Sequence, residues 1–311
     1  MAKILITESV HPIGPELLTA AGHTVVYADR DMDIIRREIV DADAVLVRII
    51  ELPGSLLATA KNLKIVSKHG VGYDNIDLDY CKSHGVAVTI TPNANSLSVA
   101  EHAFTLMLTL AKNIIPVSNE YRTVGFAAKN HAPGIEMTGK TLGLIGMGRI
   151  GKHVLHMCKD GLDMHVIVYD PYISEVPEGV EKVDDLSELL RRADVVTLHC
   201  LLTDETRKLI DRERLALMKP TALLINCARG PIVDEAALIE ALENGRLAGA
   251  GLDVTDPEPV APDSPLFKLP NVIVTPHYAP TTVESATRVS KIAAENINAV
   301  LAGKEPVGRI V

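Results

Sequence analysis

Residues 139–151 read Gly139-Lys-Thr-Leu-Gly-Leu-Ile-Gly-Met-Gly-Arg-Ile-Gly151, and this stretch decides the fold. An apolar run typical of a buried strand leads into the pattern Gly-x-Gly-x-x-Gly, which opens a helical stretch. Gly146 allows the tight turn, Gly148 lets the backbone approach a pyrophosphate, and Gly151 allows close packing of helix on strand. The free N–H groups at the start of that helix favour phosphate. The stretch therefore predicts a dinucleotide-binding α/β unit.

The next apolar run, Val166-Ile-Val-Tyr-Asp170, ends in an acid 19 residues after Gly151. An acid about 20 residues beyond the glycines is placed to bond a ribose 2′-hydroxyl. Asp170 would repel a 2′-phosphate, and residues 171–174 contain no Arg, so we expect the cofactor NAD rather than NADP. The alternative is a glycine-rich turn with a surface Asp, but strand, motif, helix and acid all stand in the required order.

Short β-branched runs alternate with helical patterns on both sides of this stretch, which predicts α/β architecture with two doubly wound parallel sheets. Before it, the expected strands are Lys3–Thr7, Thr24–Tyr27, Ala44–Ile49, Leu63–Lys68 and Val86–Thr91. After the strand that leads into Gly146, they are His165–Tyr169, Val195–Cys200, Ala222–Cys227, Gly249–Val254 and Val272–Thr275.

These strands predict two domains with a cleft between them. We assign residues 1–97 plus 289–311 to a substrate domain and residues 98–288 to an NAD-binding Rossmann domain. Two long helices would join the domains, and a cleft of this kind is a common place for a ligand.

The first joining helix is expected from about Ser98 to Arg122. Ser96 and Ser98 are possible caps, and Glu101 follows Ser98 at the spacing of a capping box. The second is expected from about Val283 to Leu301. The remaining residues 304–311 are too few for a domain, so we expect them to return to the first unit.

Composition excludes several classes of function. The net charge of -9 argues against a general nucleic-acid binder. The most apolar long stretch, Val99–Val117, carries Glu101, His102 and Lys112, so it predicts a buried helix rather than a membrane span. No secretory signal is apparent at the N-terminus. The four cysteines are widely spaced without a CxxC pair, which predicts reduced thiols, a cytoplasmic protein and no metal site.

Three residues that could carry chemistry follow expected strands of the second unit. Arg229 follows one strand, and its planar fork suits a carboxylate. His277 follows another, and histidine is the side chain that titrates near neutral pH. Glu258 follows a third and would favour the charged imidazole if it paired with His277. Each residue alone is as readily a solvated loop residue, so the joint pattern carries the hypothesis of hydride transfer to a keto acid.

The sequence resembles the D-isomer-specific 2-hydroxyacid dehydrogenases, and most closely the phosphoglycerate dehydrogenase branch. The resemblance covers roughly residues 40–290. Besides the glycine loop, it rests on ordered motifs: His69-Gly-Val-Gly-Tyr-Asp-Asn-Ile-Asp77, Asn93-Ala-Asn-Ser-Leu-Ser-Val-Ala-Glu101, Asn226-Cys-Ala-Arg-Gly-Pro-Ile-Val-Asp234, Gly251-Leu-Asp-Val-Thr-Asp-Pro-Glu-Pro259 and Thr275-Pro-His277.

The resemblance implies roles for individual residues. Arg229 would bind the substrate carboxylate and carbonyl, His277 would be the acid and base, and Glu258 would orient it. Backbone N–H groups of Val71 and Gly72 would also bind the carboxylate, and Arg48 would hold a phosphate. The implied cofactor contacts, beyond the three glycines, are Arg149, Ile150, Asp170, Cys200, Leu201, Thr206, Cys227, Ala228 and Asp253.

The family also implies a flavodoxin-like substrate domain, closure of the domains on binding, and a homodimer formed through the NAD-binding domain. Three departures concern the site. Leu201 stands where the family usually has Pro, and Tyr278-Ala-Pro280 stands where it often has small residues. Residues 49–52 do not follow the polar pattern of the phosphoglycerate branch, although Lys68 and His69 offer other positive charge. At 311 residues we expect no C-terminal regulatory domain.

The function expected from these observations is NAD-dependent hydride transfer at C2 of a small D-2-hydroxy acid or 2-keto acid. D-3-phosphoglycerate or another acid with an anionic tail is one candidate substrate. Glyoxylate or hydroxypyruvate reduction, and a formate-type dehydrogenase, are alternatives within the same class. An NAD-sensing binding protein is the alternative from another class, against which the set Arg229, Glu258 and His277 argues.

Overall fold

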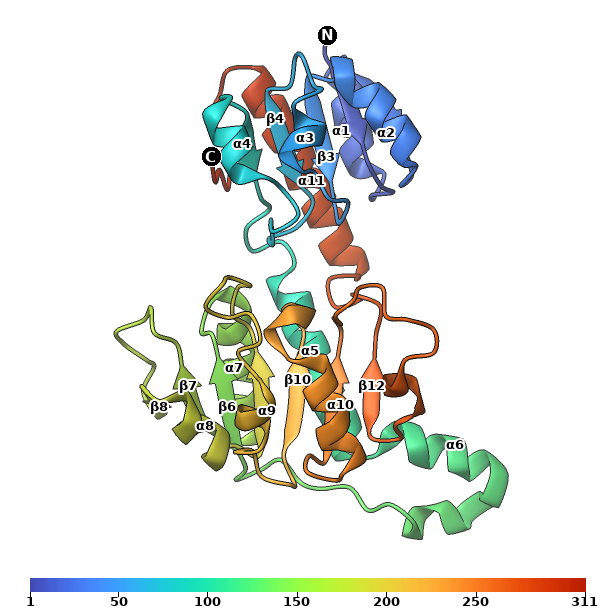
Figure 1. The fold of residues 1–311 in the computed structure, drawn as a ribbon, viewed down its shortest axis with the longest axis vertical. Helices are drawn as coiled ribbons and strands as arrows, with labels where there is room; N and C mark the ends of the chain where they lie inside the picture. Colours follow the sequence, from blue (N-terminus) through green and yellow to red (C-terminus); the bar gives the residue numbers. More distant parts are fainter. The chain divides into compact units, whose positions relative to one another are not determined.

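The structure, a computed structural model, describes all 311 residues. Its contacts divide the chain into unit 1, Met1–Asn95 with Thr281–Val311, and unit 2, Ser96–Pro280. The long C-terminal helix α11 (Val283–Leu301), red in Figure 1, belongs to unit 1 and packs there on α1 (Ile13–Ala20). The expected boundary at 288/289 would cut this helix, whose buried face covers the sheet of unit 1.

Unit 1 contains one parallel sheet of five strands in the order β2-β1-β3-β4-β5. Each expected strand is found: β1 (Lys3–Ile6), β2 (Thr24–Tyr27), β3 (Ala44–Val47), β4 (Ile65–Lys68) and β5 (Ala87–Thr89). Besides α1 and α11, the helices are α2 (Met32–Glu38), η1 (Ile39–Asp41), α3 (Gly54–Leu57) and α4 (Leu78–Ser83). β3 and β4 are buried along their whole length, because helices cover both faces of a parallel sheet.

The end of the chain is tied to β5. Ile90 N–H donates to the carbonyl of Gly308 at 2.9 Å, and Ile310 N–H donates to the carbonyl of Val88 at 2.8 Å. Thr89 and Arg309 form an antiparallel bridge. The predicted return of residues 304–311 to the first unit is confirmed.

Unit 2 contains a seven-stranded parallel sheet in the order β12-β11-β10-β9-β6-β7-β8. Its strands are β6 (Thr141–Ile145), β7 (His165–Tyr169), β8 (Val180–Lys182), β9 (Val195–Leu198), β10 (Leu223–Asn226), β11 (Gly249–Leu252) and β12 (Val272–Val274). Sequence reasoning missed β8, because this three-residue edge strand contains two charged residues and little apolar pattern. The other six are confirmed.

Helices cover both faces of this sheet, and aliphatic side chains fill the core on each side. They are α5 (Ser96–Ala111), α6 (Ile114–Val124), η2 (Gly125–Asn130), α7 (Arg149–Leu162), α8 (Leu186–Arg192), α9 (Arg212–Leu215), η3 (Gly230–Ile232), α10 (Glu235–Glu243) and η4 (Pro265–Lys268). None of the helices in the chain combines the length and the apolar composition that a membrane crossing requires.

The prediction of a single helix over 98–122 is wrong. Asn113 adopts a left-handed conformation with φ of 51° and ends the run, so α5 and α6 are separate helices. The Asn113 amide donates to the carbonyl of Pro133 at 3.2 Å, which holds the break. The capping box at Ser98 is also wrong, because α5 begins at Ser96 and contains Ser98.

Candidate active site

The strands of unit 2 end in one row. Pairing aligns Tyr169, Ile145, Leu198, Asn226, Leu252 and Val274 across β7, β6, β9, β10, β11 and β12. Every residue that the sequence assigned to catalysis or cofactor binding in this unit follows that row within a few positions, except Thr206. Because parallel strands present their carboxyl ends at one edge, the sheet gathers these residues at the edge where α/β proteins bind ligands.

The glycine loop between β6 and α7 fits a pyrophosphate. A Cβ on Gly146 would lie 2.7 Å from the backbone nitrogen of Cys200, and one on Gly151 would lie 2.3 Å from the carbonyl oxygen of Gly146. Gly148, the N-cap of α7, has open space beside it, and no side chain caps the helix. The N–H groups of the first turn therefore lack an acceptor of their own, which is the arrangement that binds phosphate at a helix start. Arg149 and Ile150 occupy that first turn.

Asp170 lies directly after β7 and braces the glycine loop. Its Oδ2 accepts a hydrogen bond from Met147 N–H at 2.9 Å, and its Oδ1 accepts one from Tyr172 N–H at 3.0 Å. A carboxylate in this position both fixes the turn and brings a negative charge to the loop. That charge disfavours a 2′-phosphate on a ribose bound there.

The loops after β9 and β10 complete this edge of the sheet. Burial raises the pKa of the half-buried Cys200 thiol to about 11, so that thiol stays protonated. Leu201 is exposed, and Thr206 Oγ1 donates to its carbonyl at 2.6 Å. After β10, Cys227 is buried, and the Asn226 side chain accepts from Ala228 N–H at 3.0 Å. These five predicted cofactor contacts thus lie on the two neighbouring loops after β9 and β10, and their contact with NAD stays a prediction.

Arg229 is half-buried at the end of β10. Asn226 Nδ2 donates to its carbonyl at 2.9 Å, and its own Nη1 donates to the carbonyl of Ala228 at 2.7 Å. Gly230 follows, where a Cβ would lie 1.9 Å from the carbonyl oxygen of Thr255. Only glycine allows this approach, which brings the loop of Arg229 against the loop that carries Glu258.

His277 and Glu258 are paired. His277 Nδ1 lies 2.6 Å from Glu258 Oε1, and the two side chains are 29% and 36% exposed. Because a carboxylate only accepts, Nδ1 carries the proton of this bond, and Nε2 is the nitrogen left to exchange a proton with a ligand. Whether Glu258 pairs with His277 was open from the sequence alone, and the structure shows that it does.

The backbone around His277 is constrained. His277 has φ of 52°, which is rare for a residue with a side chain. Its N–H donates to the carbonyls of Asp253 at 2.8 Å and Thr275 at 3.0 Å. The buried Asp253 carboxylate accepts from Tyr278 N–H and Ala279 N–H. Thr275 and His102 also contact Asp253, and sequence reasoning missed both.

The residues of unit 1 expected to bind substrate follow β3 and β4. Glu8, a buried acid after β1, accepts from Arg48 N–H at 2.7 Å, and Arg48 Nη1 donates to the carbonyl of Ser9 at 2.9 Å. The N–H groups of Val71 and Gly72 take part in no hydrogen bond within unit 1. They are therefore free to bind an anion, and the roles of all three predicted residues stay predictions.

The surroundings of Lys68 and His69 argue against the suggestion that either supplies positive charge for a ligand. Lys68 is buried, and its Nζ donates to Asn75 Oδ1 at 2.6 Å and to the carbonyl of Arg48. Burial, followed by repulsion from Arg48, lowers the pKa of His69 to about 3. His69 is therefore neutral at neutral pH. Arg48, after β3, and Arg30, after β2 and 59% exposed, are the cations of this edge with accessible side chains.

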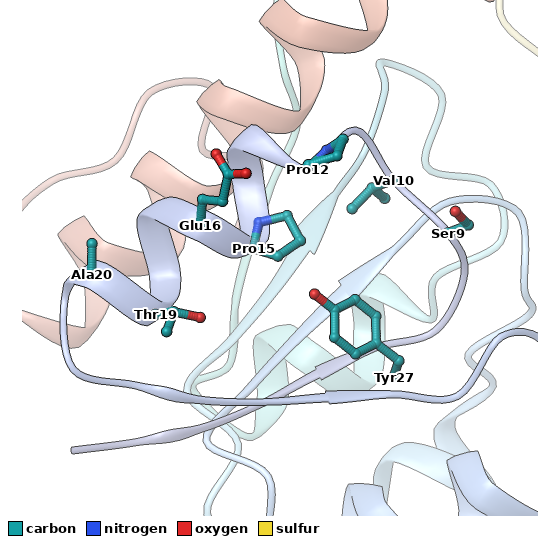
Figure 2. Close-up of a pocket in the computed structure, with 8 residues that line it drawn as sticks. All are labelled: Ser9, Val10, Pro12, Pro15, Glu16, Thr19, Ala20 and Tyr27. Carbon is teal, nitrogen blue, oxygen red and sulfur yellow. The ribbon is translucent and has the colours of Figure 1, made fainter.

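A hollow on unit 1 lies beside α1 and Tyr27 of β2 (Figure 2). Its one charged lining residue is Glu16, whose negative charge does not suit an acidic substrate. Ser9 lines it too, but its carbonyl is already bonded to Arg48. The hollow therefore does not compete with the strand ends as the site.

The parallel sheet and the uncapped glycine loop at its strand ends are those of an α/β nucleotide-binding protein. Residues 104–279 match the D-isomer specific 2-hydroxyacid dehydrogenase, NAD binding domain. The chain belongs to this family, and unit 2 contains its NAD-binding domain.

Three relatives show how far the similarity extends. The chain is 43% identical to a D-3-phosphoglycerate dehydrogenase of Methanocaldococcus jannaschii, over 98% of this chain and 58% of the relative. It therefore spans little more than half the length of that relative. It is 38% identical to a glyoxylate reductase of Thermofilum pendens, over 98% and 93% of the two chains. The crystal structure of D-lactate dehydrogenase from Aquifex aeolicus complexed with NAD and lactic acid has a TM-score of 0.88 at 32% identity, covering 96% of each chain.

Proposed function

We propose that the protein is an NAD-dependent oxidoreductase that moves a hydride between the nicotinamide and C2 of a small D-2-hydroxy acid or 2-keto acid. The 2.6 Å pairing of His277 Nδ1 with Glu258 carries the proposal. It supplies an oriented acid and base at the same sheet edge as the glycine loop. Arg229 follows the neighbouring strand and supplies the cation that a keto acid requires.

In the direction of reduction, His277 acts from its imidazolium form and donates the Nε2 proton to the carbonyl oxygen. Arg229 binds the carboxylate and stabilises negative charge that develops on that oxygen. When bound at the glycine loop, the nicotinamide cofactor would supply the hydride. In oxidation, neutral His277 accepts the hydroxyl proton at Nε2, so the two directions need opposite protonation states of one residue. Glu258 keeps Nδ1 protonated in both.

We assign cofactor binding to the glycine loop, to Asp170 and to the loops after β9, β10 and β11. The uncapped start of α7 supports a pyrophosphate there. The Asp170 charge supports NAD over NADP, because a 2′-phosphate would meet a carboxylate already held against Met147. The Asp253 carboxylate would accept from the carboxamide of the nicotinamide.

For the substrate tail we propose an anionic group bound by Arg48, with the carboxylate also bound by Val71 and Gly72. The neutral state of His69 and the burial of Lys68 favour Arg48 for this task over those two neighbours. D-3-phosphoglycerate is the first candidate, in line with the 43% identity to a phosphoglycerate dehydrogenase. Reduction of glyoxylate or hydroxypyruvate is the second, because the glyoxylate reductase relative is matched over 93% of its length.

We also propose a homodimer formed through unit 2, in the cytoplasm. In Figure 1, α6 and η2 extend from the body of unit 2, and no residue of α6 is buried. Exposed apolar side chains of this arm would be covered by a second copy: Ile114, Ile115, Tyr121, Val124 and Phe126. The four free thiols suit a reducing compartment.

The proposal is tested by NADH oxidation with glyoxylate, hydroxypyruvate, pyruvate, phosphohydroxypyruvate, sulfopyruvate, oxaloacetate and 2-oxoglutarate. We expect turnover of at least one acid, and preference for one with an anionic tail that Arg48→Gln abolishes. Turnover of glyoxylate and hydroxypyruvate, unaffected by that change, would select the second candidate. NADH binding without turnover of any acid would contradict the proposal and favour an NAD-sensing protein.

A further inference from the structure

His102, on the second turn of α5, contacts the loop that carries His277. Its side chain is 17% exposed. Its Nε2 lies 3.0 Å from Thr275 Oγ1 and 3.5 Å from Asp253 Oδ1. Its ring also meets the ring of Tyr278 edge to face, with 6.1 Å between centroids. His102 therefore touches residues on both sides of His277 in the chain, Thr275 and Tyr278.

The hydrogen bonds from His102 to Asp253 have one direction. Thr275 Oγ1 lies 2.5 Å from Asp253 Oδ1, and the carboxylate can only accept, so the threonine proton points to Asp253. Thr275 Oγ1 must then accept from His102, which places a proton on His102 Nε2. The result is a chain of donors that runs from His102 through Thr275 to Asp253.

Asp253 connects these hydrogen bonds to the loop that carries His277. Its Oδ1 also accepts from Tyr278 N–H at 2.7 Å, its Oδ2 accepts from Ala279 N–H at 2.9 Å, and its carbonyl accepts from His277 N–H at 2.8 Å. Both the backbone and the side chain of one buried aspartate thus hold the strained conformation of His277. An aspartate whose Thr275 bond is lost can rotate, and the loop then loses its two carboxylate bonds.

We propose that His102 is a positioning residue: through Thr275 and Asp253 it fixes the backbone of His277, and hence the ring against Glu258. The inference rests on the proposed function, because it assigns His102 to the acid–base step of that reaction. The ring contact with Tyr278 belongs to the stretch in which this sequence departs from its family.

Two matched pairs of variants test the proposal. His102→Ala removes the donor, whereas His102→Gln keeps an N–H donor at nearly the same reach. Thr275→Val removes the hydroxyl with little change in shape, whereas Thr275→Ser keeps it. We expect kcat to fall at least tenfold in His102→Ala and Thr275→Val. This fall should exceed any rise in the dissociation constant of NADH, to which Asp253 would also contribute. His102→Gln and Thr275→Ser should stay within threefold of the parent protein.

The double variant His102→Ala/Thr275→Val tests whether the two residues act through one series of hydrogen bonds or independently. Its kcat should be no lower than that of the less active single variant, because each change breaks the same series of hydrogen bonds. His156→Ala is the control, since His156 lies on α7 with a side chain 75% exposed. Equal losses of kcat in His102→Gln and His102→Ala would overturn the proposal, because the retained donor would then be irrelevant.

A second measurement needs neither cofactor nor turnover. In ¹⁵N-histidine-labelled protein, the ring signals of His277 are assigned by their loss in His277→Gln. We expect these signals to shift or broaden in His102→Ala and Thr275→Val but not in His102→Gln or His156→Ala. Unchanged His277 signals in the two disruptive variants would overturn the inference. Absence of turnover in the parent protein would defeat the proposed function, while the ring signals would still decide whether His102 positions His277.

Discussion

The two units repeat one architecture and differ at the same place, the residues that follow the first strand. In unit 1, β1 leads to Glu8, a buried carboxylate that accepts from Arg48 N–H and Ile49 N–H. In unit 2, β6 leads to Gly146, and the space beside the turn is left to backbone. The Glu8 side chain fills its turn and leaves no room for a pyrophosphate. The glycine turn before the uncapped helix α7 leaves that room. The fold supplies the position, and the residue placed there decides whether it binds a cofactor.

The largest expected effect separates the histidines at the two sheet edges. His277→Gln should lower kcat about 1000-fold, because general acid–base catalysis contributes on this scale. NADH should still bind in a fluorescence titration. His69→Gln should change kcat less than threefold, because a residue with a pKa of about 3 holds no proton at neutral pH. Similar losses in the two variants would show that acid–base chemistry is not confined to unit 2.

The next effect concerns the bare turn itself. Gly151→Ala would place a Cβ 2.3 Å from the carbonyl oxygen of Gly146, so we expect NADH binding to weaken about 100-fold by loss of helix–strand packing. Gly161→Ala, on the same helix, meets no atom within 4 Å and should leave binding unchanged. The dissociation constant of NADH measures both. An unaffected Gly151→Ala would mean that close packing of this turn is not needed for the cofactor.

A smaller effect tests the filled turn of unit 1. Glu8→Gln should lower the free energy of unfolding by about 1–3 kcal/mol, because backbone donors lose a buried charged acceptor. Glu16→Gln is the control: it replaces an exposed acid of α1 and should change stability by less than about 0.5 kcal/mol. Urea unfolding measures the difference. Equal free energies of unfolding in the two variants would show that the Glu8 carboxylate does not stabilise this turn.

The smallest effect is a pH dependence that both units share. Burial lowers the pKa of His199 to about 3 in unit 2, as it does for His69 in unit 1. The unfolded histidine gains its proton as pH falls through 6.5, whereas the folded one stays neutral until about pH 3. Each site therefore loses stability progressively from about pH 7 toward pH 3 and is at full stability well above pH 6.5. Between pH 7 and pH 6, His199→Gln should lose about 0.7 kcal/mol less than the parent protein. An identical loss in urea unfolding would show that His199 takes up a proton in the folded state as it does in the unfolded state.

Local sequence patterns predicted most of the strands, the glycine loop and the three candidate catalytic residues. Alternating apolar runs predicted eleven of the twelve strands by position, because buried parallel strands are apolar along their length. The glycine spacing and the acid after the next strand predicted the loop and its brace, since a turn depends on its own few residues. Arg229, Glu258 and His277 were named because each follows such a strand.

Only the tertiary structure decided which neighbours these residues meet. Burial keeps His69 neutral, and the Lys68 ammonium is hydrogen-bonded to Asn75. The apolar pattern of a strand contains information on neither. The break at Asn113 depended on one left-handed residue held by a carbonyl 20 positions away. The chain of donors from His102 joins groups 173 positions apart, Thr275 among them. Desolvation and hydrogen bonding depend on distance in space, whereas the sequence records directly only distance along the chain.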